Sequence, residues 1–157
     1  MLVREYTMSL DQYFRHWQPI RTNLLATIDK FSDRELAYVP FPGSRSVGQI
    51  IRHIANTEDG WFRYVVMQEA REWPPEFTAA AYPTVAATKV LLNRIHDHTM
   101  IYLSDWDCAD LERPIATPWG DTFTLGWIIW HVMEHEIHHR GELSLILGLM
   151  GREGLNV

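Results

Sequence analysis

The sequence of 157 residues is poor in several features that would place it in a familiar class of protein. Its single cysteine, Cys108, cannot form an internal disulfide, so nothing indicates an oxidising compartment. With 14 Lys and Arg against 20 Asp and Glu, the net charge of -6 disfavours binding to nucleic acid. No stretch reaches the roughly 18 apolar residues of a membrane span, and the charged start Met1–Tyr6 predicts no signal peptide. We therefore expect a cytoplasmic protein without nucleic-acid or membrane partners.

The chain also lacks a strand repeat, a Gly-rich phosphate loop and an internal sequence period. Its apolar residues recur instead at spacings of three and four, which is typical of amphipathic helices. Four such stretches are expected, and they run over residues 10–31, 47–69, 85–103 and 125–148. Pro19 should kink or divide the first stretch because it removes a backbone donor. The predicted fold is a single all-α domain over residues 1–157, a four-helix bundle.

The connections between these helices differ in length. Ser46 and Gln49 match a capping box at the start of the second helix, and Thr124 can cap the fourth. The Pro-rich stretch 72–83 is long enough to cross the bundle rather than to make a tight hairpin. Residues 105–122 are expected to be irregular, with short extended pieces near 113–115 and 122–123.

Histidines are the most informative residues, because four of the eight lie within residues 131–139. His135 and His139 are four apart on the fourth helix, so their side chains stack on one face about 40° apart. Both lie on a line that otherwise holds Leu, Ile and Val. Buried imidazoles need polar partners, and a divalent metal ion satisfies imidazoles at this spacing well.

A third ligand would have to come from another helix, and His53 is the only histidine of the second helix. The simpler interpretation of any single inward histidine is a hydrogen-bonded core residue. Two histidines, His135 and His139, on one inward line favour a metal site, because His53 lies on a helix that could face them. We expect His138 to lie beside the ligands or at the surface. We expect His131 to pack on the flank of the fourth helix instead of binding the metal. The remaining histidines are expected to be solvated, namely His16, His96 and His98.

Two carboxylates have open interpretations. Glu58 lies on the apolar line of the second helix, where it could support the metal site or transfer protons near it, or could form a buried hydrogen bond to a Trp or Tyr. Glu142 follows His139 by three residues and could orient that imidazole or His138, or could form a surface ion pair. Trp61, Trp127 and Trp130 are candidates to line the pocket.

Residues 135–139 also spell H-E-x-x-H, the zinc-protease signature in which the Glu activates metal-bound water. In that interpretation Glu136 would face the metal. No histidine follows His139 to supply a third ligand, and no sheet edge is evident for binding a peptide substrate. Peptide hydrolysis is therefore a remote alternative.

Three segments resemble motifs of the DinB/YfiT-like superfamily. The segment nearest the C-terminus resembles the closing motif of the family. It includes Thr117-Pro118-Trp119-Gly120, Thr124-Leu125, His131 and the stretch from His135 to Glu142. The second helix, with Ile51-Arg52-His53-Ile54-Ala55 followed by Glu58 and Trp61, resembles the family's H-[LI]-A-x-x-E-x-x-W segment. The third is Ser32-Asp33-Arg34-Glu35-Leu36. Glu142 stands where the family normally has Gln after Arg-Gly.

The resemblance implies an up-down-down-up four-helix bundle, usually a homodimer, that holds a divalent metal ion. Mapped residue by residue, it assigns the ligands to His53, His135 and His139. Some relatives are transferases and isomerases that use low-molecular-weight thiols such as bacillithiol or mycothiol.

Three protein ligands leave positions on a metal ion for water or a thiol. The leading hypothesis is therefore a metal-dependent enzyme of the thiol-transferase type, with zinc or nickel as the metal and a thiol or an electrophile as the partner molecule. The alternative from another class is a non-catalytic protein whose metal holds its helices together.

Overall fold

The computed structural model of the chain describes residues 8–155. It confirms the all-α prediction, with four long helices: α2 (Trp17–Ile28), α3 (Val47–Asp59), α4 (Val85–Ser104) and α5 (Leu125–Leu149). The prediction about a signal peptide depends on Met1–Tyr6, which lie outside the described residues. Among the helices in the described part of the chain, none combines the length and apolar character needed to cross a membrane.

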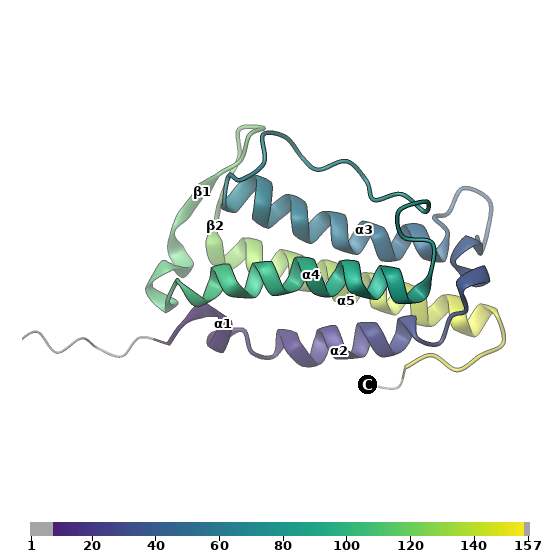
Figure 1. Cartoon of the computed structure of the whole chain (residues 1–157). Coiled ribbons are helices and arrows are strands. Elements are labelled where there is room, and N and C mark those ends of the chain that lie inside the picture. The colour runs from purple at the N-terminus through teal and green to yellow at the C-terminus, as the bar shows by residue number, and fades with distance from the viewer. Residues whose placement is uncertain (1–7, 156–157) are drawn as a thin grey trace, which may run out of the picture.

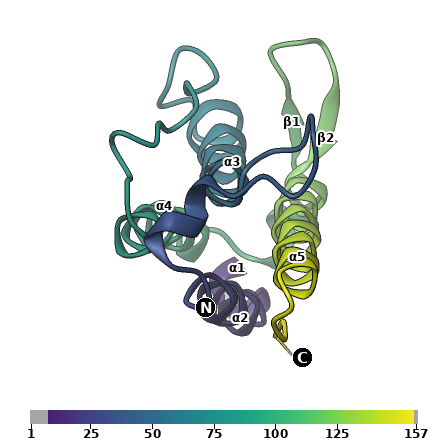
Figure 2. The same cartoon turned by 90° about the vertical axis from the view of Figure 1, so that its right-hand side faces the viewer.

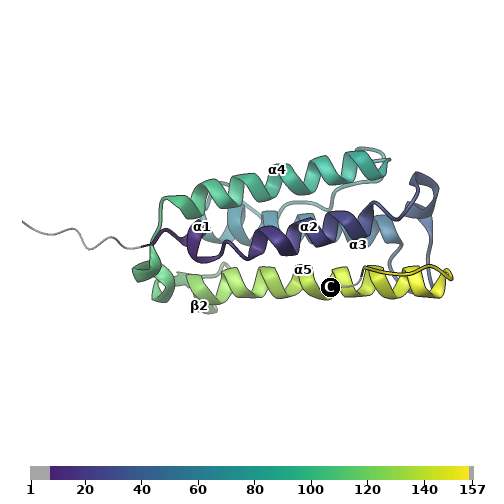
Figure 3. The same ribbon diagram turned by 90° about the horizontal axis from the view of Figure 1, so that it is seen from below.

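The helices follow an up-down-down-up course (Figure 1). α2 and α5 run in one direction, and α3 and α4 run in the other, so the segment between α3 and α4 must return along the length of the bundle. Viewed end-on, the helices form a square in which α3 packs on α4 and α5, and α2 packs on α5 and α4 (Figure 2). The view from below shows α2 between α4 and α5 (Figure 3).

The expected division of the first helical stretch occurs, but not at Pro19. A short α1 (Leu10–Tyr13) ends before α2 begins at Trp17, so Pro19 lies in the first turn of α2. The missing N–H of a proline costs little there, because the first N–H groups of a helix have no partner within it. The break at residues 14–16 therefore precedes Pro19.

The second stretch begins as predicted and ends differently. The capping box is present, with Gln49 Oε1 accepting from the Ser46 N–H at 2.8 Å. After Asp59 the helix widens into the π-helical segment η2 (Gly60–Val66) instead of continuing to residue 69. Gly60 sits where the Trp73 ring lies against the backbone, because a Cβ added there would meet that ring at 2.3 Å.

Hydrogen bonds connect residues 73–75, early in the segment between α3 and α4, to Asn56 near the end of α3. The side-chain amide of Asn56 donates to the carbonyl oxygens of Pro74 and Pro75 at 2.9 and 3.0 Å, and its Oδ1 accepts from Trp73 Nε1 at 3.0 Å. Three backbone and side-chain groups of the segment are therefore satisfied by one buried residue.

The remaining connections carry short elements: the 3-10 helices η1 (Asp33–Ala37) and η3 (Cys108–Glu112), and the strands β1 (Pro114–Ala116) and β2 (Thr122–Thr124). The strands lie close to the two extended pieces that the sequence predicted, and they pair antiparallel with Ile115 opposite Phe123, a pairing that the sequence did not predict. Thr124 caps α5 by accepting from the Trp127 N–H at 3.1 Å. The hairpin thereby leads directly into the helix that carries the histidine pair.

The interior has two apolar clusters, one toward each end of the bundle. The first contains Trp17, Ile20 and Phe62, and the second contains Leu24 and Ile50. Between Ile20 and Leu24 the inward residue of α2 is an arginine, Arg21, whose side chain is only 1% exposed. A charged layer therefore separates the two apolar clusters.

Candidate metal centre

The three predicted ligand residues come together between α3 and α5. His53 lies in the second turn of α3, and His135 and His139 are one turn apart on α5. The Nε2 atom of His135 lies 3.0 Å from Nε2 of His53 and 3.1 Å from Nε2 of His139. In the part of the chain described, no further His, Cys, Asp or Glu ligand atom joins this group. The arrangement can therefore offer three nitrogens to one ion.

The nitrogen separations fit a shared metal ion. Two ligands at about 2.1 Å from a metal and at right angles to each other lie about 3.0 Å apart, whereas a tetrahedral angle places them about 3.4 Å apart. The observed separations of 3.0 and 3.1 Å therefore suit imidazoles that would share one divalent ion.

Glu142 determines which nitrogen of His139 carries the proton. Its Oε2 lies 2.6 Å from Nδ1 of His139, so Nδ1–H donates to the carboxylate and Nε2 keeps its lone pair. Such carboxylate partners fix the orientation of metal-binding imidazoles and increase their basicity. His138 is exposed and touches His139 only edge-on, with ring centroids 4.9 Å apart. Of the two neighbours predicted, Glu142 is the one that orients a ligand.

The electrostatic environment keeps the three imidazoles neutral at neutral pH. Burial and the neighbouring histidines lower the pKa of His135 to about 3. Burial also lowers the pKa of His53 and of His139; Arg45 adds to both effects, while Glu142 opposes them. Neutral imidazole is the form that binds metals, because a proton competes for the same lone pair.

The site is closer to the surface than the sequence predicted. His139 is buried, but His53 and His135 are half-buried, and the residue of α5 that points to the bundle centre is Glu136 instead of His135. Thr57, one turn after His53, was missed in the sequence: its Oγ1 lies 3.3 Å from Nε2 of His135. The i, i+4 spacing from His53 was the available signal.

Aromatic side chains continue along α5 from the histidines toward the hairpin. His131 stacks on Trp127 with ring centroids 4.7 Å apart, and Trp61 meets both rings edge-on. Trp61 of η2 and Trp127 of α5 therefore lie together beside His131, on the side of α5 that carries the histidines. The prediction for Trp130 is wrong, because 60° of helical rotation carries it to another face, where it packs against Phe14 of the α1–α2 segment.

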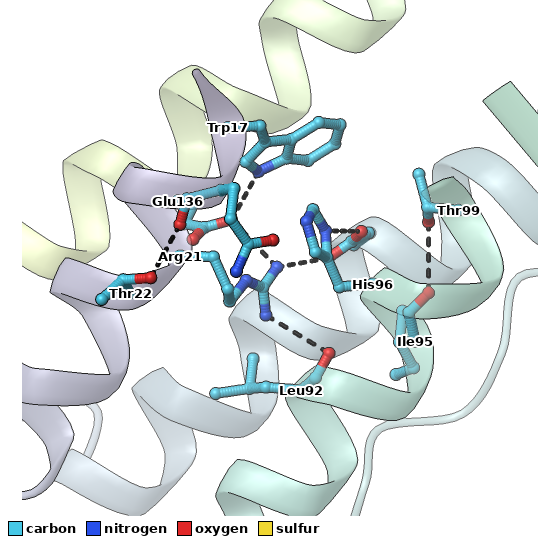
Figure 4. A network of polar contacts seen from close by, with 10 residues as sticks. Trp17, Arg21, Thr22, Leu92, Ile95, His96, Thr99 and Glu136 are labelled. Atoms are coloured by element: carbon cyan, nitrogen blue, oxygen red, sulfur yellow. Dashed lines mark hydrogen bonds and ion pairs between the residues drawn. The ribbon is translucent and has the colours of Figure 1, made fainter. Parts of the chain in front are cut away.

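Glu58 belongs to a buried polar cluster with Arg21 and His96, two residues that are labelled in Figure 4. Its Oε2 lies 2.6 Å from Nη2 of Arg21, and its Oε1 lies 2.9 Å from Nδ1 of His96. His96 is 3% exposed, so the expectation that it is solvated is wrong. Glu58 is thus a buried hydrogen-bonding residue, as one of its two interpretations held, but its partners are Arg21 and His96 instead of a Trp or Tyr.

Arg21 also pairs with Glu136 of α5. Nη2 of Arg21 lies 2.9 Å from Oε2 of Glu136 (Figure 4). The same Oε2 also accepts a hydrogen bond from Trp17 Nε1 at 2.9 Å. Nη1 of Arg21 donates to the backbone oxygen of Leu92 at 3.3 Å. One guanidinium therefore contacts α3, α4 and α5 from α2. Local sequence pattern does not indicate this pairing, because the partners lie 37 and 115 residues from Arg21.

The pKa values of Glu58 and Glu136 are shifted in opposite directions, although Arg21 lowers both. Burial raises the pKa of Glu58, but Arg21 and His96 more than offset it, and the pKa is about 2. Burial raises the pKa of Glu136, the nearby Glu58 adds to this, and Arg21 opposes it. Because Glu136 is directed at Arg21 and Trp17, it is not available to activate water on the histidine side. The zinc-protease interpretation of residues 135–139 therefore fails.

Replacing Arg21 by methionine should destabilise the protein strongly. The substitution leaves two buried carboxylates without their cation, and removing one partner of a buried ion pair costs about 3–5 kcal/mol. Urea unfolding followed by tryptophan fluorescence measures the change. The matched control is Lys89→Met, which breaks the exposed pair with Asp29 and should cost about 1 kcal/mol or less. Equal losses for both variants would show that Arg21 is not an organising residue.

Removing the carboxylate beside His139 should weaken metal binding. We expect Glu142→Ala to lower the affinity for Zn²⁺ or Ni²⁺ about 10- to 100-fold, as is usual for partners of metal-binding histidines. Glu142→Gln should lie between this variant and the unmodified protein, because an amide oxygen still accepts a hydrogen bond without a charge. Competition with a chromogenic chelator gives the affinities. Glu134→Ala, an exposed residue of the same helix, is the control, and an equal effect there would contradict the assignment.

Comparison with known proteins agrees with this architecture. The protein-family model of the DinB superfamily matches residues 16–143. The uncharacterized protein YizA of Bacillus subtilis (strain 168) is 26% identical over 132 residues, which cover 83% of this chain and 80% of YizA. The family match begins before α2 and ends within α5, so the positions of the three histidines lie inside its span.

Solved structures show the same fold. A DinB-like protein from Bacillus cereus ATCC 10987 superimposes with a TM-score of 0.73 at 16% identity, covering 95% of this chain and 97% of that one. YfiT from Bacillus subtilis superimposes with a TM-score of 0.58 at 20% identity over 94% of each chain. YfiT is described as a probable metal-dependent hydrolase with an unusual four-helix bundle topology. With a family model that covers most of its length, this chain belongs to the DinB superfamily.

Proposed function

We propose that this protein is a metal-dependent enzyme that transfers a low-molecular-weight thiol to an electrophile. His53, His135 and His139 would hold the metal ion, with zinc or nickel as the expected metal. The observation that carries the proposal is the convergence of three Nε2 atoms at 3.0 and 3.1 Å without a fourth protein ligand from the described residues. A closed structural site would use four protein ligands.

A bound divalent ion lowers the pKa of a thiol or water molecule that reaches it, which makes the nucleophile available at neutral pH. The chain's own residues prepare that position. Glu142 fixes the His139 imidazole, and the Thr57 hydroxyl is placed to hydrogen-bond a molecule bound beside His135. In the proposed transfer the sulfur forms a bond to an electrophilic carbon while the bond to the leaving group breaks, and the thiol proton passes to solvent.

The surroundings of the histidines suit an organic substrate. Trp61, Trp127 and His131 extend an aromatic surface from the histidines toward the hairpin, and Trp127 remains 42% exposed. Aromatic side chains bind apolar groups and exclude water from a reacting centre. This surface supports an electrophile with an apolar body.

Metal-dependent hydrolysis is the second candidate, and the description of YfiT favours it. Water would then take the position proposed for the thiol. Glu136 cannot serve as the base, so a hydrolase would need Glu142 or hydroxide bound directly to the metal.

The homodimer and the cytoplasmic location stay predictions. A homodimer has one supporting observation in the described residues, a groove of about 380 Å³ where exposed apolar side chains gather over α1, α2 and α5. Tyr13 is 50% exposed and Trp130 is 55% exposed in this groove. A second copy of the chain could cover them.

Turnover tests the proposed reaction directly. Metal-stripped protein reloaded with Zn²⁺ or Ni²⁺ should accelerate the reaction of bacillithiol, mycothiol or cysteine with an activated aryl chloride, measured by the absorbance of the thioether product. His139→Ala should lower the rate by more than the roughly 10- to 100-fold that is usual when a metal-binding histidine loses its hydrogen-bond partner, because this variant removes the metal ligand itself. His16→Ala, which changes an exposed histidine in the break between α1 and α2, should keep full rate.

The other outcomes discriminate between the candidates. Metal-dependent cleavage of an activated ester without any thiol would replace transfer by hydrolysis. A strong fall in melting temperature on chelation, without metal-dependent turnover of thiols or esters, would favour a structural metal.

A further inference from the structure

Arg52 is a buried cation without a protein partner. It precedes His53 on α3, its side chain is 8% exposed, and among residues 8–155 no hydrogen bond and no ion pair within 4.0 Å involves it. Arg21, the other deeply buried arginine, makes two ion pairs. None of its side-chain nitrogens is among the fully enclosed, unpartnered atoms of the described residues, so the guanidinium can be reached from solvent and is free to pair with an anion.

The chain makes room for this guanidinium. Gly48 lies one turn before Arg52, and a Cβ added at Gly48 would lie 2.8 Å from Nη1 of Arg52 and 2.9 Å from the Leu36 backbone oxygen. Any larger residue would displace the arginine or the adjoining 3-10 helix. The position of Arg52 is therefore set by close packing against α3 and η1.

Arg52 lines a cavity that adjoins the metal centre through His53. The cavity has a volume of about 310 Å³ and is also lined by Gln49, His53, Glu76 and Phe77. His53 belongs both to this cavity and to the histidine group, since its Nε2 lies 3.0 Å from Nε2 of His135. A small molecule that occupies the cavity beside His53 can therefore place an acidic group at Arg52. A second cavity of about 480 Å³, next to η1, shares Arg52 with the first.

The charges around Arg52 leave its positive charge available. Glu76 is exposed and makes no ion pair with it, although it is near enough to raise the pKa of Arg52 against the larger, opposite effect of burial. Asp33, in the second cavity, accepts from the Val85 N–H at 2.8 Å through Oδ1. Arg45 adds positive potential near His53 and His139. An anion entering the first cavity would meet Arg52 and one solvent-exposed carboxylate, Glu76.

We propose that Arg52 binds an oxyanionic group of the substrate, a carboxylate or a phosphate, while the reacting end of the same molecule lies at the three histidines. The planar guanidinium pairs with such groups through two parallel hydrogen bonds, and burial strengthens the interaction. The inference deepens the proposed function and depends on it for the position of the reacting end. It names acidic thiols, or acidic esters in the case of hydrolysis, as the substrate class.

Anion binding is tested first without metal, which separates it from the proposed reaction. Propionate and inorganic phosphate are titrated into ¹⁵N-labelled metal-free protein, with propionamide as the uncharged analogue. We expect saturable shifts of the Arg52 side-chain Nε–H signal for one or both anions and none for propionamide. Arg52→Gln should weaken the binding at least about tenfold, since hydrogen bonds to charged groups are strong. Arg34→Gln, an exposed arginine of η1, should leave it unchanged.

The metal-loaded protein tests the shared site. 3-Mercaptopropionate should bind at least about tenfold more tightly than 2-mercaptoethanol, and Arg52→Gln should abolish this preference without changing metal affinity. Arg52→Lys, which keeps the charge without the planar fork, should retain part of it. If the unmodified protein binds no metal, the proposed function fails while the metal-free titration still decides the role of Arg52. Absence of shifts at Arg52 with both anions, or an equal preference in Arg52→Gln, would overturn the inference.

Discussion

The buried guanidinium of Arg21 is the constraint on which the rest of the structure depends. It pairs with Glu58 on α3 and Glu136 on α5, and it bonds the backbone of α4. Each carboxylate adjoins a residue of the candidate site, because Thr57 precedes Glu58 and His135 precedes Glu136. Fixing the two carboxylates on one cation therefore fixes the register of α3 against α5, and with it the 3.0 Å separation between His53 and His135. Apolar side chains alone could slide past one another more easily.

This arrangement gives α5 two chemically different faces. Residue 136 points to the interior and residues 135 and 139 point toward α3, so a charged core and a neutral, ligand-rich groove lie on the same helical turn. The metal centre is thereby placed at the rim of the bundle, where solvent and small molecules can enter. Glu142 would then act on the metal ion through His139, while Arg52 would bind the acidic group of a bound molecule.

The sequence predicted the parts of the structure that local pattern controls. The spacing of apolar residues located all four long helices, the capping residues Ser46 and Thr124 located two of their starts, and the pair His135 and His139 followed from helical geometry. The involvement of His53 was predicted from its place on the second helix and from the family resemblance. These features depend on residues within one or two helical turns.

The parts that were missed depend on distant partners. His96 was expected in solvent because nothing in α4 indicates that Glu58 faces it, and Trp130 was misplaced because the edge of the bundle is set by how α1 packs. The π-helical end of the second stretch begins at Gly60, where the Trp73 ring of a segment without regular structure lies against the backbone. Only the packed chain shows such contacts.

X-ray absorption spectroscopy of the zinc- or nickel-loaded protein most directly tests the claim that three histidines share one metal ion and leave it open. The account predicts one ion per chain, three imidazole nitrogens at about 2.0–2.1 Å and at least one oxygen ligand that a thiol replaces with a sulfur scatterer. A shell with fewer than three imidazoles, or a fourth protein ligand that no added thiol displaces, would contradict it.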